Sequence, residues 1–248
     1  MKVYISLTSI KGNQWALIRT LKSLVVQTRK PDHCFLYLSD HSYLLDKGFK
    51  GRDISHGGVS GFIEENSDWI TVKWVVNTGP YRKLVPLLTD CWGEDVCIIT
   101  VDDDTVYGEN LVENMMEDYA QHGCCVGNRS FTLDLKGGGL DQLSYGSRIA
   151  RNEQSLRSLH NFHTGKGGVL YHPDFFSSTK SLFSDSSKFT TVCKTSDDVW
   201  FNYLRIVNGV DCVMGKSRHS YSLADNTTYL GLWKNINRKA SKGECGNT

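Results

Sequence analysis

Three consecutive aspartates, Asp102, Asp103 and Asp104, follow the almost wholly apolar run from Val96 to Val101. Such a run is typical of a parallel strand buried on both faces, and open α/β sheets bind ligands at the carboxyl ends of their strands. If the strand continues through the triplet, Asp102 and Asp104 share one face and Asp103 points away. Because neighbouring carboxylates repel each other, the pattern predicts a Mg²⁺ or Mn²⁺ site. A solvated turn rich in aspartate is the alternative interpretation.

The same residues fit a second chemistry. An apolar strand followed by Asp-x-Asp-x-Thr, here Asp102 to Thr105, resembles the nucleophile motif of haloacid-dehalogenase-type phosphatases. In that family the motif ends the first strand of the fold, whereas here about a hundred residues of strand and helix patterns precede it. A phosphatase with Asp102 as nucleophile is therefore kept as the alternative function.

A second pair of acids, Asp197 and Asp198, begins a helical pattern that ends near Val207. Acids at a helix start bind free N–H groups and oppose the helix dipole, so a purely structural role is the alternative to a catalytic one. Helical spacing predicts the buried stripe of this helix as Val199, Trp200, Tyr203, Leu204 and Val207. It places on the opposite face Asn202, Arg205 and Asn208.

Two further segments carry residues that suit phosphate chemistry. Glycines at 165, 167 and 168 allow a substrate to approach the backbone closely or allow positive φ, although the segment is not a P-loop. A flexible turn before a strand is the alternative interpretation. Arg82 and Lys83 precede a helix predicted from Pro86, where cations favour a diphosphate, and solvated surface is the alternative.

The elements that must position these residues alternate between strand and helix. Strands are predicted at 3–7, 35–38, 70–76, 96–101, 125–127, 168–171 and 210–214, with helices at 15–26, 86–91, 109–121 and 196–207. Residues 40–68 are looser, with one short helix at most, and 130–165 reads as a long loop region. This alternation predicts an α/β fold with a mostly parallel sheet.

Composition narrows the function classes. The 248 residues carry 28 Lys and Arg against 27 Asp and Glu, so the chain lacks the basic bias of nucleic-acid binders. No segment approaches the ~18 to 20 apolar residues that span a bilayer. The first residues lead into a core strand rather than a signal peptide. We therefore expect a soluble, cytoplasmic protein without a nucleic-acid partner, whose eight cysteines are reduced and structural.

Six segments, in this order, resemble the nucleotide-sugar glycosyltransferases of the GT-A fold. The resemblance is to the family-2-like enzymes of bacterial polysaccharide synthesis and large DNA viruses in particular. The six segments are Ser6 to Ile10, Gln27 to Asp32, Lys83 to Pro86, Thr100 to Asp104, Thr164 to Tyr171 and Ser196 to Trp200. The resemblance implies a GT-A (Rossmann-like) single domain over 1–242, with helices flanking the sheet. Its nucleotide-binding half would cover about 1–128 and its acceptor-binding half about 129–242, before a disordered tail at 243–248.

The resemblance also implies roles for individual residues. Thr8, Ser9 and Asp40 would surround the nucleobase and ribose, and Lys83 would approach the diphosphate. Asp102 and Asp104 would hold the ribose and the metal, with Asp104 the direct ligand, and Asp103 joins the residues that bind the donor. Asp198 would be the general base, although Asp197 stands where many relatives carry Glu, so either acid could act. His219 is a possible further metal ligand.

These expectations combine into one predicted function. The chain would use Mn²⁺ or Mg²⁺ to transfer a sugar from a nucleotide donor, UDP by resemblance, to a glycan or glycoconjugate hydroxyl, with inversion favoured. A non-catalytic module that binds sugar nucleotides is the third alternative.

Overall fold

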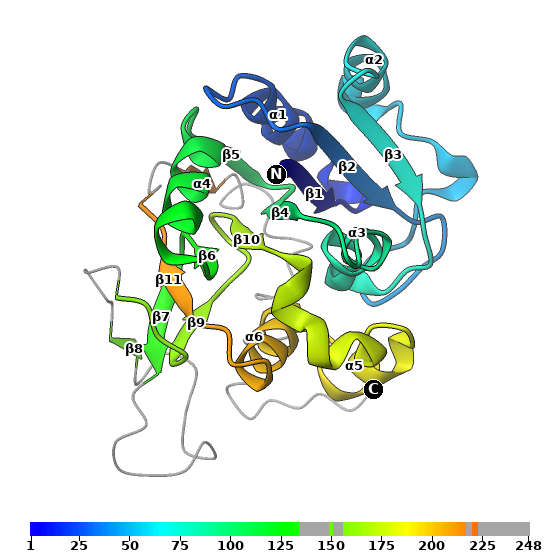
Figure 1. Ribbon diagram of the computed structural model, residues 1–248. Coiled ribbons are helices and arrows are strands. Elements are labelled where there is room, and N and C mark those ends of the chain that lie inside the picture. Colours follow the sequence, from blue (N-terminus) through cyan, green and yellow to red (C-terminus); the bar gives the residue numbers. More distant parts are fainter. Residues whose placement is uncertain (134–148, 151–155, 217–219, 223–248) are drawn as a thin grey trace.

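The computed structural model describes residues 1–133, 149–150, 156–216 and 220–222, and for 149–150 and 220–222 it describes the backbone alone. Within this part of the chain, seven strands form one sheet in the order β11-β6-β10-β4-β1-β2-β3 (Figure 1). The strands are β1 (Lys2–Thr8), β2 (His33–Leu38), β3 (Ile70–Trp74), β4 (Val96–Asp102), β6 (Cys125–Gly127), β10 (Val169–Tyr171) and β11 (Cys212–Met214). All neighbours pair in parallel except β10, which runs antiparallel to both β4 and β6. The predicted mostly parallel sheet is confirmed.

The topology places a ligand-binding edge between β1 and β4. The chain builds β2 and β3 on one side of β1 and then returns to place β4 on the other side. Ligands of open α/β sheets bind at such a switch point, outside the carboxyl ends of the strands. Here Thr8 at the end of β1 lies beside Asp102 at the end of β4. The acid triplet therefore begins at the switch point.

Helices cover both faces of the sheet. The α-helices are α1 (Gln14–Val25), α2 (Val59–Glu65), α3 (Val85–Asp90), α4 (Leu111–His122), α5 (Ser186–Val192) and α6 (Asp197–Val207). Short 3₁₀ segments are η1 (Lys11–Asn13), η2 (Lys50–Arg52), η3 (His56–Gly58), η4 (Gly79–Lys83) and η6 (Pro173–Leu182). The predicted helices that end near 26, 91, 121 and 207 are confirmed, whereas η6 and α5 carry too weak a pattern to have been predicted.

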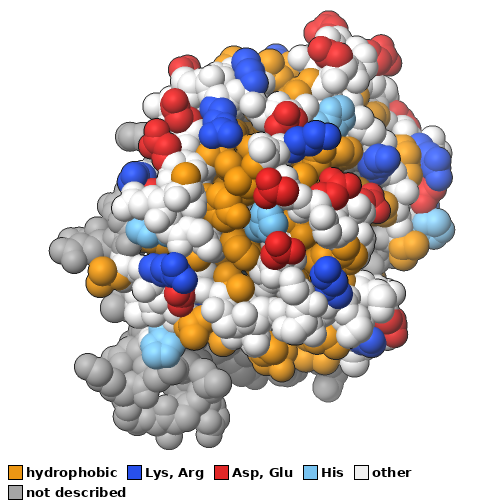
Figure 2. Space-filling model, viewed as in Figure 1, with side chains coloured by type: hydrophobic (Ala, Val, Ile, Leu, Met, Phe, Trp, Pro, Cys, Tyr) orange, Lys and Arg blue, Asp and Glu red, His pale blue; other side chains and the backbone are white. Residues whose placement is uncertain are grey.

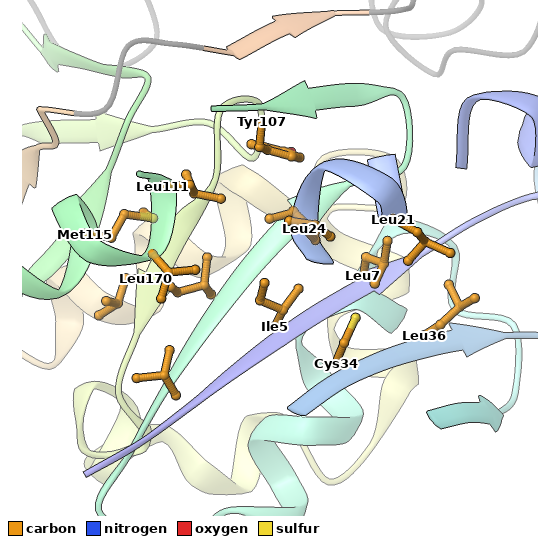
Figure 3. Packing of buried hydrophobic residues seen from close by; sticks show 14 of the residues in the cluster. Ile5, Leu7, Leu21, Leu24, Cys34, Leu36, Tyr107, Leu111, Met115 and Leu170 are labelled. Carbon is orange, nitrogen blue, oxygen red and sulfur yellow. The ribbon is translucent and has the colours of Figure 1, made fainter. Parts of the chain in front are cut away.

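Two hydrophobic clusters lie on opposite faces of the sheet, because alternate residues of each strand point to opposite faces. Cys97, Ile99 and Val101 of β4 face the cluster that α1, α2 and α4 cover, where Leu21 and Met115 meet the sheet (Figure 3). The other face of β4 packs into the cluster formed with α3, η6, α5 and α6. Burial on both faces explains why β4 reads as a continuous apolar run.

Small sheets occupy part of the region predicted as loop. β7 (Ser130–Leu133) pairs antiparallel with β8 (Ile149–Ala150) and with β9 (Asn161–His163). A second ribbon joins β5 (Thr105–Tyr107) to β12 (Ser220–Ser222). The expectation of a long loop over 130–165 is therefore wrong for β7, β8 and β9, because strands of two to four residues leave no periodic signal.

The predicted buried stripe of α6 is also wrong in part. Trp200 and Leu204 are buried as expected, but Tyr203 and Val207 are 55% and 53% exposed, while Arg205 is fully buried. Val199 is likewise exposed, and Asn202 is buried together with Arg205. A helix can bury polar side chains when neighbouring segments form hydrogen bonds with them. The spacing of apolar residues alone cannot predict such a face.

The mixed surface charges and the free cysteines are those that the composition led us to expect. On the face shown in Figure 2, basic and acidic side chains are interspersed, and acidic side chains gather near the middle. The seven described cysteines are free thiols, as predicted, and Cys245 lies outside the described residues. Across the described ranges, no helix is long and apolar enough to cross a membrane.

Candidate functional site

Lys83 joins the two acid motifs into one site. Its Nζ lies 3.1 Å from Asp102 Oδ1, at the end of β4, and 3.1 Å from Asp197 Oδ2, at the start of α6. Its side chain is only 9% exposed, and the backbone before α3 is fixed by Ser6, whose hydroxyl donates to the Lys83 carbonyl at 2.5 Å. The alternative that Arg82 and Lys83 are solvated surface residues is wrong, because the structure buries both side chains.

Asp198 differs from its neighbour in its partners. Its Oδ1 accepts the backbone N–H of Gly165 at 2.9 Å, and it forms no ion pair with any described residue. Burial and the charge of Asp197 raise the pKa of the Asp198 carboxyl to about 7, against the lowering effect of Lys83. A carboxyl with such a pKa near neutral pH suits proton transfer.

Gly165 lies where the two motifs meet. A Cβ at this residue would come within 2.5 Å of Lys83 Nζ, 3.3 Å of Asp198 Oδ1 and 3.4 Å of Asp102 Oδ1. The glycine-rich segment therefore belongs to the site, and this glycine serves close approach rather than positive φ.

The acid triplet does not follow the alternation of a strand. β4 ends at Asp102, and a turn carries Asp103 and Asp104. The Asp103 carboxylate, predicted to point away, accepts hydrogen bonds from the Ser9 hydroxyl and, at 3.4 Å, from Asn13 Nδ2. The three carboxylates still share one charged neighbourhood, because burial and the nearby acids raise the pKa of Asp103 to about 7 and that of Asp104 to about 6.

Backbone contacts hold the turn in place. The Thr20 hydroxyl lies 3.0 Å from the carbonyl of Asp103 and 2.8 Å from that of Thr105. The Asp102 N–H donates to the buried Tyr107 hydroxyl at 2.8 Å. Thr8, predicted near the nucleobase, donates its hydroxyl to the Tyr37 carbonyl at 2.7 Å.

Asp40 lies just beyond the end of β2, where it pairs with His41 at 2.6 Å and Arg52 at 3.4 Å. Its role toward the nucleobase stays a prediction. His219, the further metal ligand suggested by the sequence, lies outside the described residues, as does the tail from 243 to 248.

A buried ion pair close to the site was not predicted. Arg82 Nη2 lies 2.9 Å from Asp46 Oδ2, and both side chains are almost fully buried. Asn77 Nδ2 also donates to Asp46, at 2.9 Å. Arg82 Nη1 is buried without a partner among the described residues, which leaves a strong donor unused. The sequence analysis named Arg82 as a possible phosphate ligand and not as a partner of Asp46, which lies in the loosely patterned stretch.

The donor set of the triplet fits a hard divalent cation. Carboxylate oxygens are the ligands of Mg²⁺ and Mn²⁺, and a cation would relieve the repulsion that raises the pKa of Asp103 and Asp104. The described residues contain no group of three or more His, Cys, Asp or Glu arranged to hold a metal. One or two carboxylates together with the phosphates of a ligand are a common Mg²⁺ arrangement, so two carboxylates of the triplet fit this kind of site.

Comparisons with known proteins give the fold. No family model and no curated protein matches the chain. Residues 1–349 of TarS from S. aureus align with 92% of this chain at 14% identity and a TM-score of 0.57, over 62% of the TarS fragment. The complex of that fragment with UDP-GlcNAc aligns with 86% of this chain, over 55% of its own, at 13% identity and a TM-score of 0.51. A 4-diphosphocytidyl-2C-methyl-D-erythritol synthase aligns with 92% of this chain and 95% of its own at 10% identity, with a TM-score of 0.51.

At these identities the likeness shows a shared fold. It confirms the predicted α/β architecture with a mostly parallel sheet flanked by helices. This chain covers less than two thirds of the TarS fragment.

Proposed function

We propose that this protein is a glycosyltransferase that moves a sugar from a nucleoside diphosphate sugar to an acceptor hydroxyl. The acceptor oxygen forms a bond to the anomeric carbon while the bond from that carbon to the diphosphate oxygen breaks. The electron pair of the broken bond leaves with the diphosphate, and the acceptor proton passes to Asp198. An inverting displacement is the outcome that such a base favours.

The contrast between Asp197 and Asp198 carries this proposal. Asp197 is tied to the buried Lys83 ammonium, whereas Asp198 keeps a carboxylate oxygen free of hydrogen bonds to described residues. Because burial and Asp197 raise its pKa to about 7, Asp198 can take a proton in the neutral range and release it again. Asp198 is therefore the base, and Asp197 holds Lys83 in place.

The remaining groups suit the donor. Lys83 lies at the switch point, where a cation stabilises the charge that develops on a departing diphosphate. Mn²⁺ or Mg²⁺ held by Asp104 and Asp102 would supply further positive charge for the leaving group.

UDP is the nucleotide we propose. TarS, a glycosyltransferase of the GT-A type, has been crystallised with UDP and with UDP-GlcNAc. The likeness in fold supports UDP without identifying the sugar.

A donor panel tests the reaction class. Purified protein is incubated with UDP-, GDP-, CMP- and dTDP-sugars in Mn²⁺, and the free nucleotide is measured. We expect release of UDP from at least one UDP-sugar. Release of phosphate from phosphomonoesters, with no nucleotide sugar consumed, would instead support the phosphatase alternative with Asp102 as nucleophile.

Paired variants test the base. Asp198→Asn should lower transfer by ~10² or more and leave UDP affinity and the melting temperature almost unchanged. Asp197→Asn should mainly lower stability, by ~1 to 3 kcal/mol, because it removes one carboxylate from the buried Lys83 while Asp102 remains. Two fully active variants would eliminate a carboxylate base at this helix, and full loss with Asp197→Asn alone would move the base to Asp197.

Nucleotidyl transfer is the second candidate, because the synthase aligns over 95% of its own chain. That reaction would release pyrophosphate from a nucleoside triphosphate when a sugar phosphate is supplied. A pyrophosphate assay with the four ribonucleoside triphosphates distinguishes it from the release of UDP.

A further inference from the structure

The segment Gly165–Gly168 forms a tight turn that is anchored on both sides of the site. The Gly168 N–H donates to the Gly165 carbonyl at 3.1 Å, which closes a four-residue turn. Gly167, the third residue of this turn, has φ +91°, the left-handed value that a type II turn requires at that position. Asn128 Nδ2 donates to the Gly167 carbonyl at 2.8 Å, and the Gly165 N–H donates to Asp198. The turn is therefore fixed rather than free.

Lys166 occupies the exposed tip of this turn. It follows Gly165, where an added Cβ would lie within 3.4 Å of Lys83, Asp102 and Asp198, so the tip stands at the rim of the site. Lys166 is exposed and forms no hydrogen bond or ion pair with the described residues.

The other cations of the site are already engaged. Lys83 is shared between Asp102 and Asp197, and Arg82 is paired with Asp46. Asp102 and Asp197 therefore share one buried lysine, and Asp198 lies beside the same glycine, Gly165, without an ion pair to any described residue. A diphosphate that entered this neighbourhood would need a further positive charge that is free to turn toward it.

We propose that Lys166 binds the diphosphate of the donor from the tip of the Gly165–Gly168 turn. This inference rests on the proposed function and deepens it. Lys83 would stand on the buried side of the leaving group and Lys166 on its exposed side. A lysine on a flexible stem suits this position, since a compact ammonium can follow a phosphate as charge moves onto it.

Binding measurements with a ligand series test the inference. Calorimetric titration in Mn²⁺ compares UDP with uridine, which lacks the phosphates, for the wild type and Lys166→Met. We expect Lys166→Met to weaken UDP binding by about tenfold, the usual scale for a lost hydrogen bond to a charged group. Uridine binding should not change, and Lys166→Arg should restore most of the UDP affinity. The matched control is Lys22→Met, at an exposed lysine of α1 that forms no hydrogen bond with the described residues.

Each other result overturns the inference. If Lys166→Met binds UDP as the wild type does, the lysine does not contact the diphosphate. If UDP and uridine weaken equally, the residue acts on the nucleoside or on the fold. A wild-type protein that binds neither ligand overturns the proposed function as well, whereas tight UDP binding that ignores Lys166 overturns this inference alone.

Discussion

Lys83 connects two acids that are far apart in the sequence, Asp102 and Asp197, each at 3.1 Å. Burying a cation is costly unless carboxylates and hydrogen bonds replace its water. The opposing charges raise the pKa of Lys83 well above its usual value despite its burial, so the ammonium stays charged. One side chain thus fixes the distance between the carboxyl end of β4 and the start of α6.

Gly165→Ala tests how tightly this junction is packed. The new Cβ would lie 2.5 Å from Lys83 Nζ, so the flexible lysine must move away from its carboxylates. We expect sugar transfer to fall by about tenfold or more, because small displacements in a site are costly. Stability should fall by ~1 to 3 kcal/mol, measured by urea unfolding.

Gly61→Ala is the matched control. Its added Cβ meets no heavy atom within 4 Å, and it lies inside α2, where alanine can add up to ~1 kcal/mol. If both variants behave alike, Gly165 does not provide close approach, and Lys83 has room that the structure does not indicate.

At the scale of elements, α6 depends on polar contacts across its buried face. Arg205 Nη1 donates to the Val210 carbonyl at 2.8 Å, and Nη2 donates to the carbonyls of Leu159 and Asn161. Asn202 Nδ2 donates to the His163 carbonyl at 2.8 Å and to the Asp198 carbonyl at 2.7 Å. The helix that carries the acid pair is therefore held against β9 by hydrogen bonds as well as by packing.

Arg205→Met should destabilise the protein by ~2 to 4 kcal/mol, since several buried carbonyls lose their donor at once. Arg205→Lys should recover part of this loss because an ammonium can satisfy some of the same oxygens. The measurement is urea unfolding at neutral pH. Val207→Thr, at a position that is 53% exposed on the same helix, should change stability by less than ~0.5 kcal/mol. If Val207→Thr lost more stability than Arg205→Met, the helix would have the orientation that its apolar spacing predicts.

Sequence patterns predicted the elements that bury a continuous apolar surface. β4 was predicted because both of its faces are apolar, and α1 because Leu17, Leu21 and Leu24 recur on one side. The buried face of α6 could not be predicted, because it depends on carbonyls from segments that are distant in sequence. For the triplet, strand alternation was favoured and a turn was the alternative, because alternation says nothing about where a strand stops.

The sequence predicted which residues belong to the site better than it predicted how they contact one another. Asp102, Asp197 and Asp198 do converge, with Lys83 between Asp102 and Asp197, and Gly165 meets them. The sequence could not distinguish the two acids of α6, because their difference arises from one ion pair with a lysine that is distant in the chain. The Asp46–Arg82 pair left no pattern at all, since neither residue lies in a periodic segment.

For the whole molecule, the raised carboxyl pKa values couple stability to pH. Asp103 and Asp198 each titrate at about 7 in the folded protein, against about 3.8 when exposed. Between these values the folded state binds more protons than the unfolded state, so these groups lower the free energy of unfolding as pH rises from ~4 to ~7. His163 acts in the opposite direction, because burial and Arg205 hold its pKa well below 6.5 and the unfolded state takes the proton as pH falls.

Asp103→Asn isolates one of these contributions. Urea midpoints of the wild type and the variant are compared at pH 5.5 and pH 8 at fixed ionic strength. The His163 effect is common to both proteins and cancels in the difference. We expect the variant to gain stability relative to the wild type at pH 8, where a charged Asp103 is half-buried beside Asp104. A difference that is the same at both pH values would show that Asp103 titrates normally.

Nucleotide and metal should stabilise the whole fold jointly, because the triplet offers carboxylates to a cation whose remaining ligands would be phosphate oxygens. We expect UDP with Mn²⁺, at a hundredfold excess over its dissociation constant, to add ~2.7 kcal/mol and to raise the melting temperature by about 5 to 10 °C. A chelator should remove most of this shift. Asp104→Asn should lose the Mn²⁺-dependent part while folding normally, since it removes a charge that Asp102 repels. Asp68→Asn, an exposed acid just before β3, should keep the full shift. Equal UDP shifts with and without Mn²⁺ in the wild type would mean that Lys83 and Lys166 hold the nucleotide without a bridging metal. Asp104 would then be one more half-buried acid of the turn.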